Sequence, residues 1–378
     1  MDNVDYEIIF TGAGDKVEKD ADAICLRYKS GTDASGNDEY KTLVYDCGFE
    51  ANANAAQDFM NGHFFAGGKA RKIDYVVASH MDADHISGLK LILENYEVGA
   101  LYANLPWNYT DELYDKINDA RITKESLAER LKSSYSNLDD LEKVAKKQKI
   151  EIKETFAGEL IGDKIRVLSP SKDFFLENIA TSAKNEFLES KEEPTANALE
   201  KLLLGVKETI RKVKAFWEEE NLREAVETSA ENETSVILFG EMGTDRNFLL
   251  TGDAGVKALN AATKQAEKMG IILAESVSFY QIPHHGSKHN VSPSVLDSIV
   301  GPKVAKGTIG RKTAFVSTAK GSDHPRKIVL NGFITRGVKA FNSNGAHLRH
   351  HVGSMPNIEG WGTATPEEFS DEVEAWEN

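Results

Sequence analysis

The chain has 378 residues and a net charge of −15, with 45 Lys and Arg against 60 Asp and Glu. This acidic balance argues against a protein that coats nucleic acid, and the length suits one α/β enzyme domain with insertions. No apolar run approaches the length of a membrane span, and the acidic start does not resemble a secretory signal. We therefore expect a cytoplasmic protein without membrane contact, in which Cys25 and Cys47 are buried thiols.

The first third of the chain alternates short apolar runs with turns. Runs rich in β-branched residues predict strands at residues 6–10, 23–28, 41–48, 73–78 and 99–103. A helix is expected within residues 50–72, and another is expected to begin at Ile86. The first third of the chain is therefore predicted to be mainly β-sheet, with a helix after the fourth strand.

The fourth strand leads into a dense group of ligand-type side chains. His80, Asp82, Asp84 and His85 lie within six residues, directly after the strand. Four such groups are costly to bury together unless a cation lies between them, so the stretch predicts a divalent-metal site. The alternative is a polar turn that caps the following helix through Asp84.

Two later stretches change to helical periodicity. Thr110, Thr123 and Ser136 each begin a predicted helix within residues 105–148. Residues 172–227 also read as helical, because apolar residues recur there at three- and four-residue steps, namely Leu199, Leu202, Leu203, Val206, Ile210, Val213 and Trp217. We expect both stretches to be helical insertions outside the sheets, one of which covers the site or binds a protein partner or a second copy of the chain. An acidic and partly mobile tail is expected over residues 356–378.

Strands return in the second half of the chain. They are expected at residues 150–152, 164–170, 235–239, 247–250, 277–282, 313–317 and 338–341. Strand ends along the whole chain carry metal-capable residues at Asp46, at His80 to His85, at Asp253 and at His284 with His285. A sheet that presents all of these residues at one edge would build a single site.

The order of these groups resembles the metallo-β-lactamase superfamily. The matching motifs are Asp46 before Gly48, Ser-His-x-Asp-Ala-Asp-His-Ile-x-Gly-Leu at 79–89, Leu-Leu-Thr-Gly-Asp-Ala at 249–254, Pro-His-His-Gly-Ser at 283–287, and His324 before Pro325. Within the superfamily the chain is most similar to the hydrolase domain of ComEC-type DNA-uptake proteins, whose membrane channel it lacks. The resemblance implies an α/β fold, a four-layer αββα sandwich over residues 1–355 that carries the two helical insertions.

The resemblance also implies two divalent metal ions, Zn²⁺ or Mn²⁺. Carried over residue by residue, His80 and Asp82 would bind the first ion, Asp84 and His85 the second, and Asp253 both. Asp82 stands where the family more often has a second histidine, and this oxygen-rich set shifts the preference from Zn²⁺ toward Mn²⁺.

The remaining family positions depart from the family pattern or offer two candidates in this sequence. The family's third-block histidine is not visible, and Asn232 is a weak substitute for it. The Pro-x-His-Gly spacing favours His285 as the last ligand of the second ion, so His284 would face the substrate as a proton donor, with His324 as the other candidate acid. Asp46, Asn232 and Ser235 would support the ligands.

The function that follows is a metal-dependent hydrolysis. Two ions would lower the pKa of a bridging water, which Asp84 would position. Residues 284–351 carry eleven Lys and Arg but only two acidic residues, and substrate phosphates would contact Ser287, Lys288, Lys320 and Arg326. The best reading is a phosphodiesterase or nuclease acting on DNA. The alternatives are a hydrolase of a small anionic ester, lactone or phosphoester, and a regulatory subunit that binds metal weakly.

Overall fold

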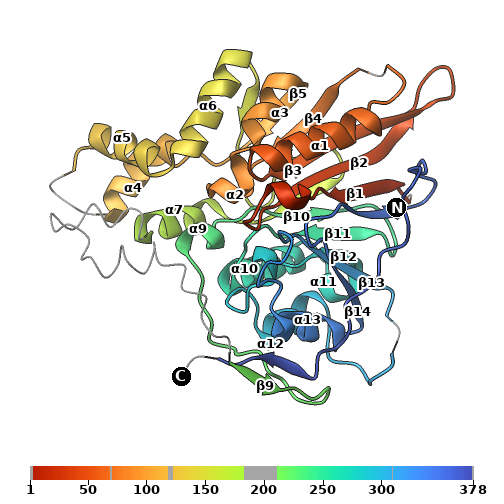
Figure 1. Ribbon diagram of the computed structural model, residues 1–378. Helices are drawn as coiled ribbons and strands as arrows, with labels where there is room; N and C mark the ends of the chain where they lie inside the picture. The colour runs from red at the N-terminus through yellow and green to blue at the C-terminus, as the bar shows by residue number, and fades with distance from the viewer. Residues whose placement is uncertain (1–2, 69, 118–121, 183–210, 309, 377–378) are drawn as a thin grey trace.

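Two β-sheets pack face to face, and helices cover both outer faces (Figure 1). The computed structural model describes residues 3–376 except 69, 118–121, 183–210 and 309. In this part of the chain the four layers follow one another as helices, sheet, sheet and helices. The predicted αββα fold is therefore confirmed.

The first sheet has seven strands among the described residues. Its spatial order is β15 (Leu348–Val352), β1 (Tyr6–Phe10), β2 (Ala23–Thr32), β3 (Asp38–Cys47), β4 (Lys72–Val77), β5 (Glu97–Tyr102) and β6 (Glu151–Lys153). The strands from β15 to β3 pair antiparallel, and those from β3 to β6 pair parallel. The edge strand β15 comes from the far end of the chain, and the sequence analysis did not anticipate it.

The second sheet also has seven strands in the described part of the chain. Its order is β14 (Val338–Asn342), β13 (Lys312–Val316), β12 (Val277–Gln281), β11 (Asn247–Leu250), β10 (Ile237–Gly240), β8 (Ile165–Ser169) and β7 (Leu160–Ile161). The strands from β11 to β14 are parallel, so their carboxyl ends lie at the same edge of the sheet.

Aromatic side chains fill the space between the sheets. Phe279 of β12 packs edge-on against Phe10 and Phe315, with ring centroids 6.1 and 5.0 Å away. Each of these rings is at most 4% exposed, so the sandwich interior is a continuous apolar core that holds the two sheets in a fixed relation.

Separate apolar cores lie under the two outer helical layers. The first sheet is covered by α1 (Glu50–Gly62), α3 (Leu89–Asn95), α4 (Thr110–Ile117), α5 (Lys124–Ser134), α6 (Ser136–Gln148) and α7 (Lys172–Thr181). The second is covered by α10 (Val256–Lys268), α11 (Leu273–Ser276), α12 (Pro293–Ile299) and α13 (Lys327–Ile334). The sequence analysis did not identify the helices of this second layer.

The stretch 105–148 is helical, as the sequence predicts. Thr123 and Ser126 form a reciprocal capping box at the start of α5. Leu127, Leu131 and Leu141 are buried in the same core as α1 and α3. The apolar faces of α5 and α6 are thus used within the chain, as an extension of the outer layer.

The helical prediction for residues 172–227 is only partly right. Residues 172–181 form α7, and residues 183–210, including the first five residues of the predicted stripe, lie outside the described part. The prediction is wrong at Val213, which lies in the short strand β9 (Lys212–Lys214), and at Trp217, which lies in a turn. Trp217 donates its indole N–H to the carbonyl of Val304 and packs against Phe369, contacts that override the local pattern.

The C-terminal segment, predicted to be an acidic tail, contains a short paired strand. Strand β16 (Glu372–Glu374) pairs antiparallel with β9, and Val373 is 1% exposed. The carboxylate of Glu374 accepts hydrogen bonds from the backbone N–H groups of Lys327 and Ile328, at 2.9 and 3.1 Å, and so caps α13.

Candidate metal centre

The predicted site residues come together where strands of both sheets end. The first sheet contributes Asp46 and the segment from His80 to His85, and the second contributes Asp253, His284 and His285. A backbone hydrogen bond from Val236 N–H to Ser79 O, at 2.9 Å, joins the loops of the two sheets, and another from His284 N–H to Gly252 O, at 3.2 Å, joins two loops of the second sheet. The loops therefore hold one another in place at the edge of the sandwich.

His85 is oriented by a buried carboxylate. Asp46 lies at the end of β3 with φ of 56°, and its Oδ1 accepts the Ser79 backbone N–H at 2.8 Å. Its Oδ2 lies 2.8 Å from Nδ1 of His85. This contact fixes the proton of His85 on Nδ1 and turns Nε2 toward the centre of the site.

His285 is oriented in the same way by a backbone carbonyl. Its Nδ1 donates to the carbonyl of Ser317 at 3.0 Å, which leaves Nε2 directed into the site, 3.6 Å from Oδ2 of Asp84. His80 has its Nδ1 3.0 Å from the hydroxyl of Ser79. Three imidazoles thus present Nε2 to one space.

Asp253 lies at the centre of these imidazoles. Its backbone N–H donates to the hydroxyl of Ser235 at 3.1 Å. Its Oδ1 is 3.0 Å from Nε2 of His85, and its Oδ2 is 3.9 Å from Nε2 of His80 and 3.5 Å from Nε2 of His284. The two oxygens of one carboxylate therefore face different histidines.

Several of these atoms are buried without a hydrogen-bond partner among the described residues. They are Nε2 of His80, His85 and His285, and Oδ1 of Asp253. The short distance between His85 and Asp253 does not have hydrogen-bond geometry. Buried polar atoms are rarely left unpaired, and a cation among them would satisfy all four, so the residues present fit a divalent metal ion.

The structure adds Asp22, which the sequence analysis missed. Ligand atoms of Asp22, His85, Asp253 and His285 all lie within 4.8 Å of one another, and all four residues are buried. Asp22 directly precedes β2, and because β2 runs antiparallel to β1 and β3, its beginning lies at the edge where those strands end. That rule could have identified Asp22 from the sequence.

The protonation equilibria of the cluster reflect close opposite charges. Burial opposes ionisation of Asp253, but His85 and His284 outweigh it and hold the pKa of the carboxyl well below its usual range. Burial likewise opposes the charge on His85, yet Asp253 and Asp46 raise its pKa well above the ordinary value. Burial also opposes the charge on His285, but the neighbouring Asp84 raises the pKa of His285 to about 9. A bound metal ion would take the place of these imidazole protons.

Asp82 and Asp84 line the accessible side of the site. Their side chains are 27% and 31% exposed, and Oδ2 of Asp82 is 3.7 Å from Nε2 of His80. Asn232, in contrast, lies behind the imidazole of His284. Its amide lies 2.7 Å from the hydroxyl of Thr228 and 3.1 Å from Nδ1 of His284, so it contacts the rear of a histidine.

His324 lies outside the central cluster but beside it. Its Nδ1 is 3.0 Å from a carboxylate oxygen of Asp20, two residues before Asp22. The loop that carries His324 packs on the His284–Gly286 turn, because the Arg326 N–H donates to the Gly286 carbonyl at 3.0 Å. The imidazole is 27% exposed and is held by Asp20.

The predicted substrate-binding residues differ in availability. Lys288 donates to the carbonyl of Ala375 at 3.1 Å and lies over the Trp376 ring, and Lys320 pairs with Asp15 at 2.8 Å. The Ser287 hydroxyl accepts from the His289 N–H at 3.3 Å. Arg326 has no carboxylate within 4.0 Å among the described residues, so it is the cation of this set best able to contact a substrate.

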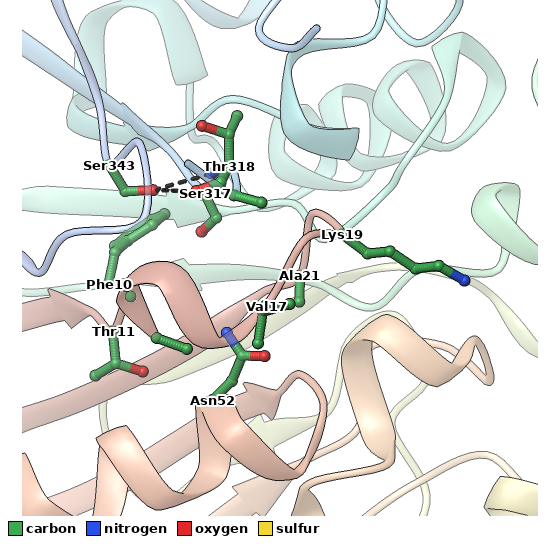
Figure 2. A pocket seen from close by; sticks show the side chains of 13 residues that line it. Phe10, Thr11, Val17, Lys19, Ala21, Asn52, Ser317, Thr318 and Ser343 are labelled. Carbon is green, nitrogen blue, oxygen red and sulfur yellow. Dashed lines mark hydrogen bonds between the residues drawn. The ribbon is translucent and has the colours of Figure 1, made fainter. Parts of the chain in front are cut away.

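A small pocket opens next to the cluster (Figure 2). Ala21, between Asp20 and Asp22, lines it together with Ser317, whose carbonyl holds His285. Figure 2 shows Ser343 bonded to the backbone of Thr318 on one wall and Asn52 of α1 on the other. The space open to water in this pocket is about 10 Å³, enough for one water molecule.

One family profile matches part of the sequence. A profile described as the Metallo-beta-lactamase superfamily matches residues 37–145, the segment that contains Asp46 and His80 to His85. Residues 37–145, less than a third of the chain, are therefore similar to the Metallo-beta-lactamase superfamily. No curated protein matches the sequence. Asp253 and His285 lie outside the matched residues. The fold brings them next to the matched residues Asp46 and His80 to His85.

Solved structures resemble this chain only distantly. A putative metallo-beta-lactamase from Thermotoga maritima is 10% identical, with a TM-score of 0.30 over 67% of this chain and 79% of its own. A diphosphatase from the PhnP family is 11% identical, with a TM-score of 0.37 over 93% and 100%. The metallo-beta-lactamase SMB-1, bound to 2-mercaptoethanesulfonate, is 8% identical, with a TM-score of 0.29 over 78% and 86%.

Proposed function

We propose that this protein is a metal-dependent hydrolase of phosphate esters. The observation that carries the proposal is the gathering of Nε2 of His80, His85 and His285 around the carboxylate of Asp253, where these three nitrogens and Oδ1 of Asp253 are buried without hydrogen-bond partners among the described residues. Two divalent ions, Zn²⁺ or Mn²⁺, would be held by His80, Asp82, Asp84, His85, Asp253 and His285. When bound, such ions polarise a substrate oxygen and lower the pKa of water.

The residues on the open side of the site have separate roles in this proposal. Asp84 is partly exposed and next to His285, so it orients the attacking water through the oxygen that does not face the imidazole. His324, fixed by Asp20, delivers a proton to the leaving group through Nε2. Asp46 and Ser235 keep His85 and Asp253 in position.

A small anionic ester suits this site better than long duplex DNA. Of the eleven Lys and Arg between 284 and 351, six form ion pairs with carboxylates, namely Lys303, Arg311, Lys320, Lys327, Arg336 and Arg349. Lys288 and Lys312 donate to backbone carbonyls. The positive charge of this segment is therefore largely neutralised by the fold, and little remains for a phosphate backbone.

A nuclease acting on DNA is the second candidate. Arg326, Lys306 and Lys339 have no carboxylate within 4.0 Å among the described residues, and Arg326 adjoins the His284–Gly286 turn. The similarity of motifs 79–89 and 283–287 to ComEC-type hydrolase domains favours the same reading.

A cytoplasmic location also remains a proposal, supported by two buried free cysteines. Over the described residues, no helix is long and apolar enough to span a bilayer.

Turnover by the purified protein tests these candidates. The protein is loaded with Mn²⁺, Zn²⁺ or Mg²⁺ and assayed against a model phosphodiester, a phosphomonoester, a lactone, a thioester, plasmid DNA and a single-stranded oligonucleotide. We expect metal-dependent cleavage of the small phosphodiester that is lost in His85→Ala. Faster cleavage of DNA would favour the nuclease. No turnover with any metal would refute the hydrolase and favour a regulatory subunit that binds a partner.

A further inference from the structure

We infer that His284 is a ligand of the first metal ion, together with His80, Asp82 and Oδ2 of Asp253. His284 would thus supply the ligand that the third sequence block lacks, while His285 serves the second ion. This inference rests on the metal dependence in the proposed function and assigns a residue that the sequence analysis placed as a proton donor. Consecutive histidines of one turn would then bind different ions.

The carboxylate of Asp253 divides the site into two halves. Its Oδ1 faces His85, 3.0 Å away, in the half that contains His285. Its Oδ2 faces His80 at 3.9 Å and His284 at 3.5 Å. Two ligands of one ion, each about 2.1 Å from it, lie about 3.0–3.5 Å apart, so both sets of distances need only small movements to close on an ion.

The turn that carries both histidines makes them diverge. His284 and His285 have φ of 47° and 54°, in the left-handed region, and their ring planes are 65° apart with centroids separated by 5.9 Å. His285 is directed to the half with His85, whereas Nε2 of His284 is directed to the opposite oxygen of Asp253. Successive residues in the left-handed region are unusual outside glycine, which indicates that the surrounding contacts maintain this turn.

A buried amide orients His284 as a ligand rather than as an acid. Nδ1 of His284 is 2.9 Å from Oδ1 of Asn290, which is 0% exposed and whose amide nitrogen donates to the Asp253 carbonyl at 2.8 Å. Two amides meet this nitrogen, since the amide nitrogen of Asn232 also lies 3.1 Å from Nδ1. With the proton on Nδ1, where Oδ1 of Asn290 accepts it, Nε2 carries a lone pair that suits a metal ligand.

The assignment gives each half two imidazole nitrogens and one oxygen of Asp253. Asp82 adds a carboxylate to the first half, whereas Asp84 and Asp22 add carboxylates to the second. The second half is therefore richer in carboxylate oxygen than the first.

Metal counting on paired variants tests the inference. Asn tolerates the left-handed conformation, so His284→Asn and His285→Asn are matched substitutions. Each protein is saturated with Mn²⁺, dialysed, checked by circular dichroism and analysed for metal content. We expect two ions in the wild type, one in either single variant, one in His284→Asn with Asp82→Asn, and none in His284→Asn with His285→Asn. His289→Asn is the control in the same loop, because His289 packs against Trp376, and it should keep two ions.

The outcomes separate this inference from the proposed function. Two ions bound by His284→Asn with wild-type affinity would overturn the inference, and loss of turnover in that variant would then place His284 on the substrate. Two ions in a wild type that hydrolyses nothing would refute the function and leave the ligand assignment intact. If the variants do not fold, pulsed electron paramagnetic resonance of the Mn²⁺-loaded wild type counts nitrogen ligands: two imidazoles on each ion support the assignment, and one on either ion contradicts it.

Discussion

Asp84 is the acidic side chain whose loss should separate catalysis from folding. Its Oδ2 lies near His285, and burial of the carboxyl is outweighed by that histidine, which lowers the pKa of Asp84. We expect Asp84→Ala to reduce turnover by at least about 10²–10³-fold, since both a metal contact and the orientation of water are lost.

The measurement for Asp84 combines steady-state rates in Mn²⁺ with circular dichroism and thermal unfolding. A cooperative unfolding transition like that of the wild type shows that the fold persists, because the side chain is partly exposed and the surrounding strands do not depend on it. A folded Asp84→Ala protein that turns over at nearly the wild-type rate would contradict the proposed mechanism.

His350 should make the fold sensitive to acid. Its ring stacks on Phe279 with centroids 4.4 Å apart and lies 3.3 Å from the Tyr6 hydroxyl, and burial lowers its pKa to about 3. In the unfolded chain the same ring takes a proton near pH 6.5. The free energy of unfolding should therefore fall as the pH falls from about 6.5 toward 3, by up to about 1.4 kcal/mol for each pH unit.

Urea unfolding at pH 7 and pH 5 measures this effect. The variant His350→Phe lacks the titrating group and keeps an aromatic ring, so its stability should fall less over the same interval than that of the wild type. Since other groups titrate equally in both proteins, the difference between them isolates His350. Equal losses in the two proteins would show that this ring does not titrate on unfolding.

At the scale of elements, Glu374 connects the C-terminal strand to a helix of the second sheet. Its carboxylate accepts the first backbone N–H groups of α13, which would otherwise be buried without partners. We expect Glu374→Ala to lower the free energy of unfolding by about 1 kcal/mol, as loss of other helix caps does. Glu372→Ala, at an exposed position of the same strand, should have little effect. Similar denaturation midpoints for the two variants would exclude the capping role.

The sequence predicts elements well where burial is local and periodic. The strands that lead to His80 and Asp253 are rich in apolar residues, so both their existence and the residues at their ends could be anticipated. The prediction fails at Val213, because β9 is held only by its pairing with β16, more than 150 residues away. Strand β15 was missed for a similar reason, since Arg349 and His350 give it a polar character that only contacts with Glu7 and Tyr6 explain.

The metal site, too, could be predicted from the sequence only where its residues form a local motif. His80 to His85 form a local motif that the sequence reveals directly. The separate assignments of His284 and Asn232 could not be predicted, because they depend on which oxygen of Asp253 each side chain faces. Asp22 belongs to no local motif, and only the antiparallel pairing of β2 brings it to the cluster.

At the scale of the whole molecule, most Lys and Arg of the basic segment 284–351 already have partners within the chain. We therefore expect the affinity for DNA to depend only weakly on salt concentration. Only Lys306, Arg326 and Lys339 of the basic segment lack a described carboxylate or carbonyl partner, so at most about three phosphates would be neutralised. The logarithm of the binding constant for duplex DNA should then fall with the logarithm of salt concentration with a slope no steeper than about −3. Fluorescence anisotropy of a labelled duplex between 50 and 200 mM salt, conditions chosen for the assay, measures the slope. A slope near −6 would restore DNA as the favoured substrate.

The pairing of β1 with β15 also constrains how the chain is made. Tyr6 lies opposite Val352, so β1 lacks its outer partner until residue 352 has left the ribosome. Asp253 and His285 likewise emerge long after His80 and His85. The complete set of candidate ligands is therefore assembled late in synthesis, and the nascent first sheet exposes an unpaired β1 edge to other chains. Protection of that edge during translation becomes a requirement of the topology itself.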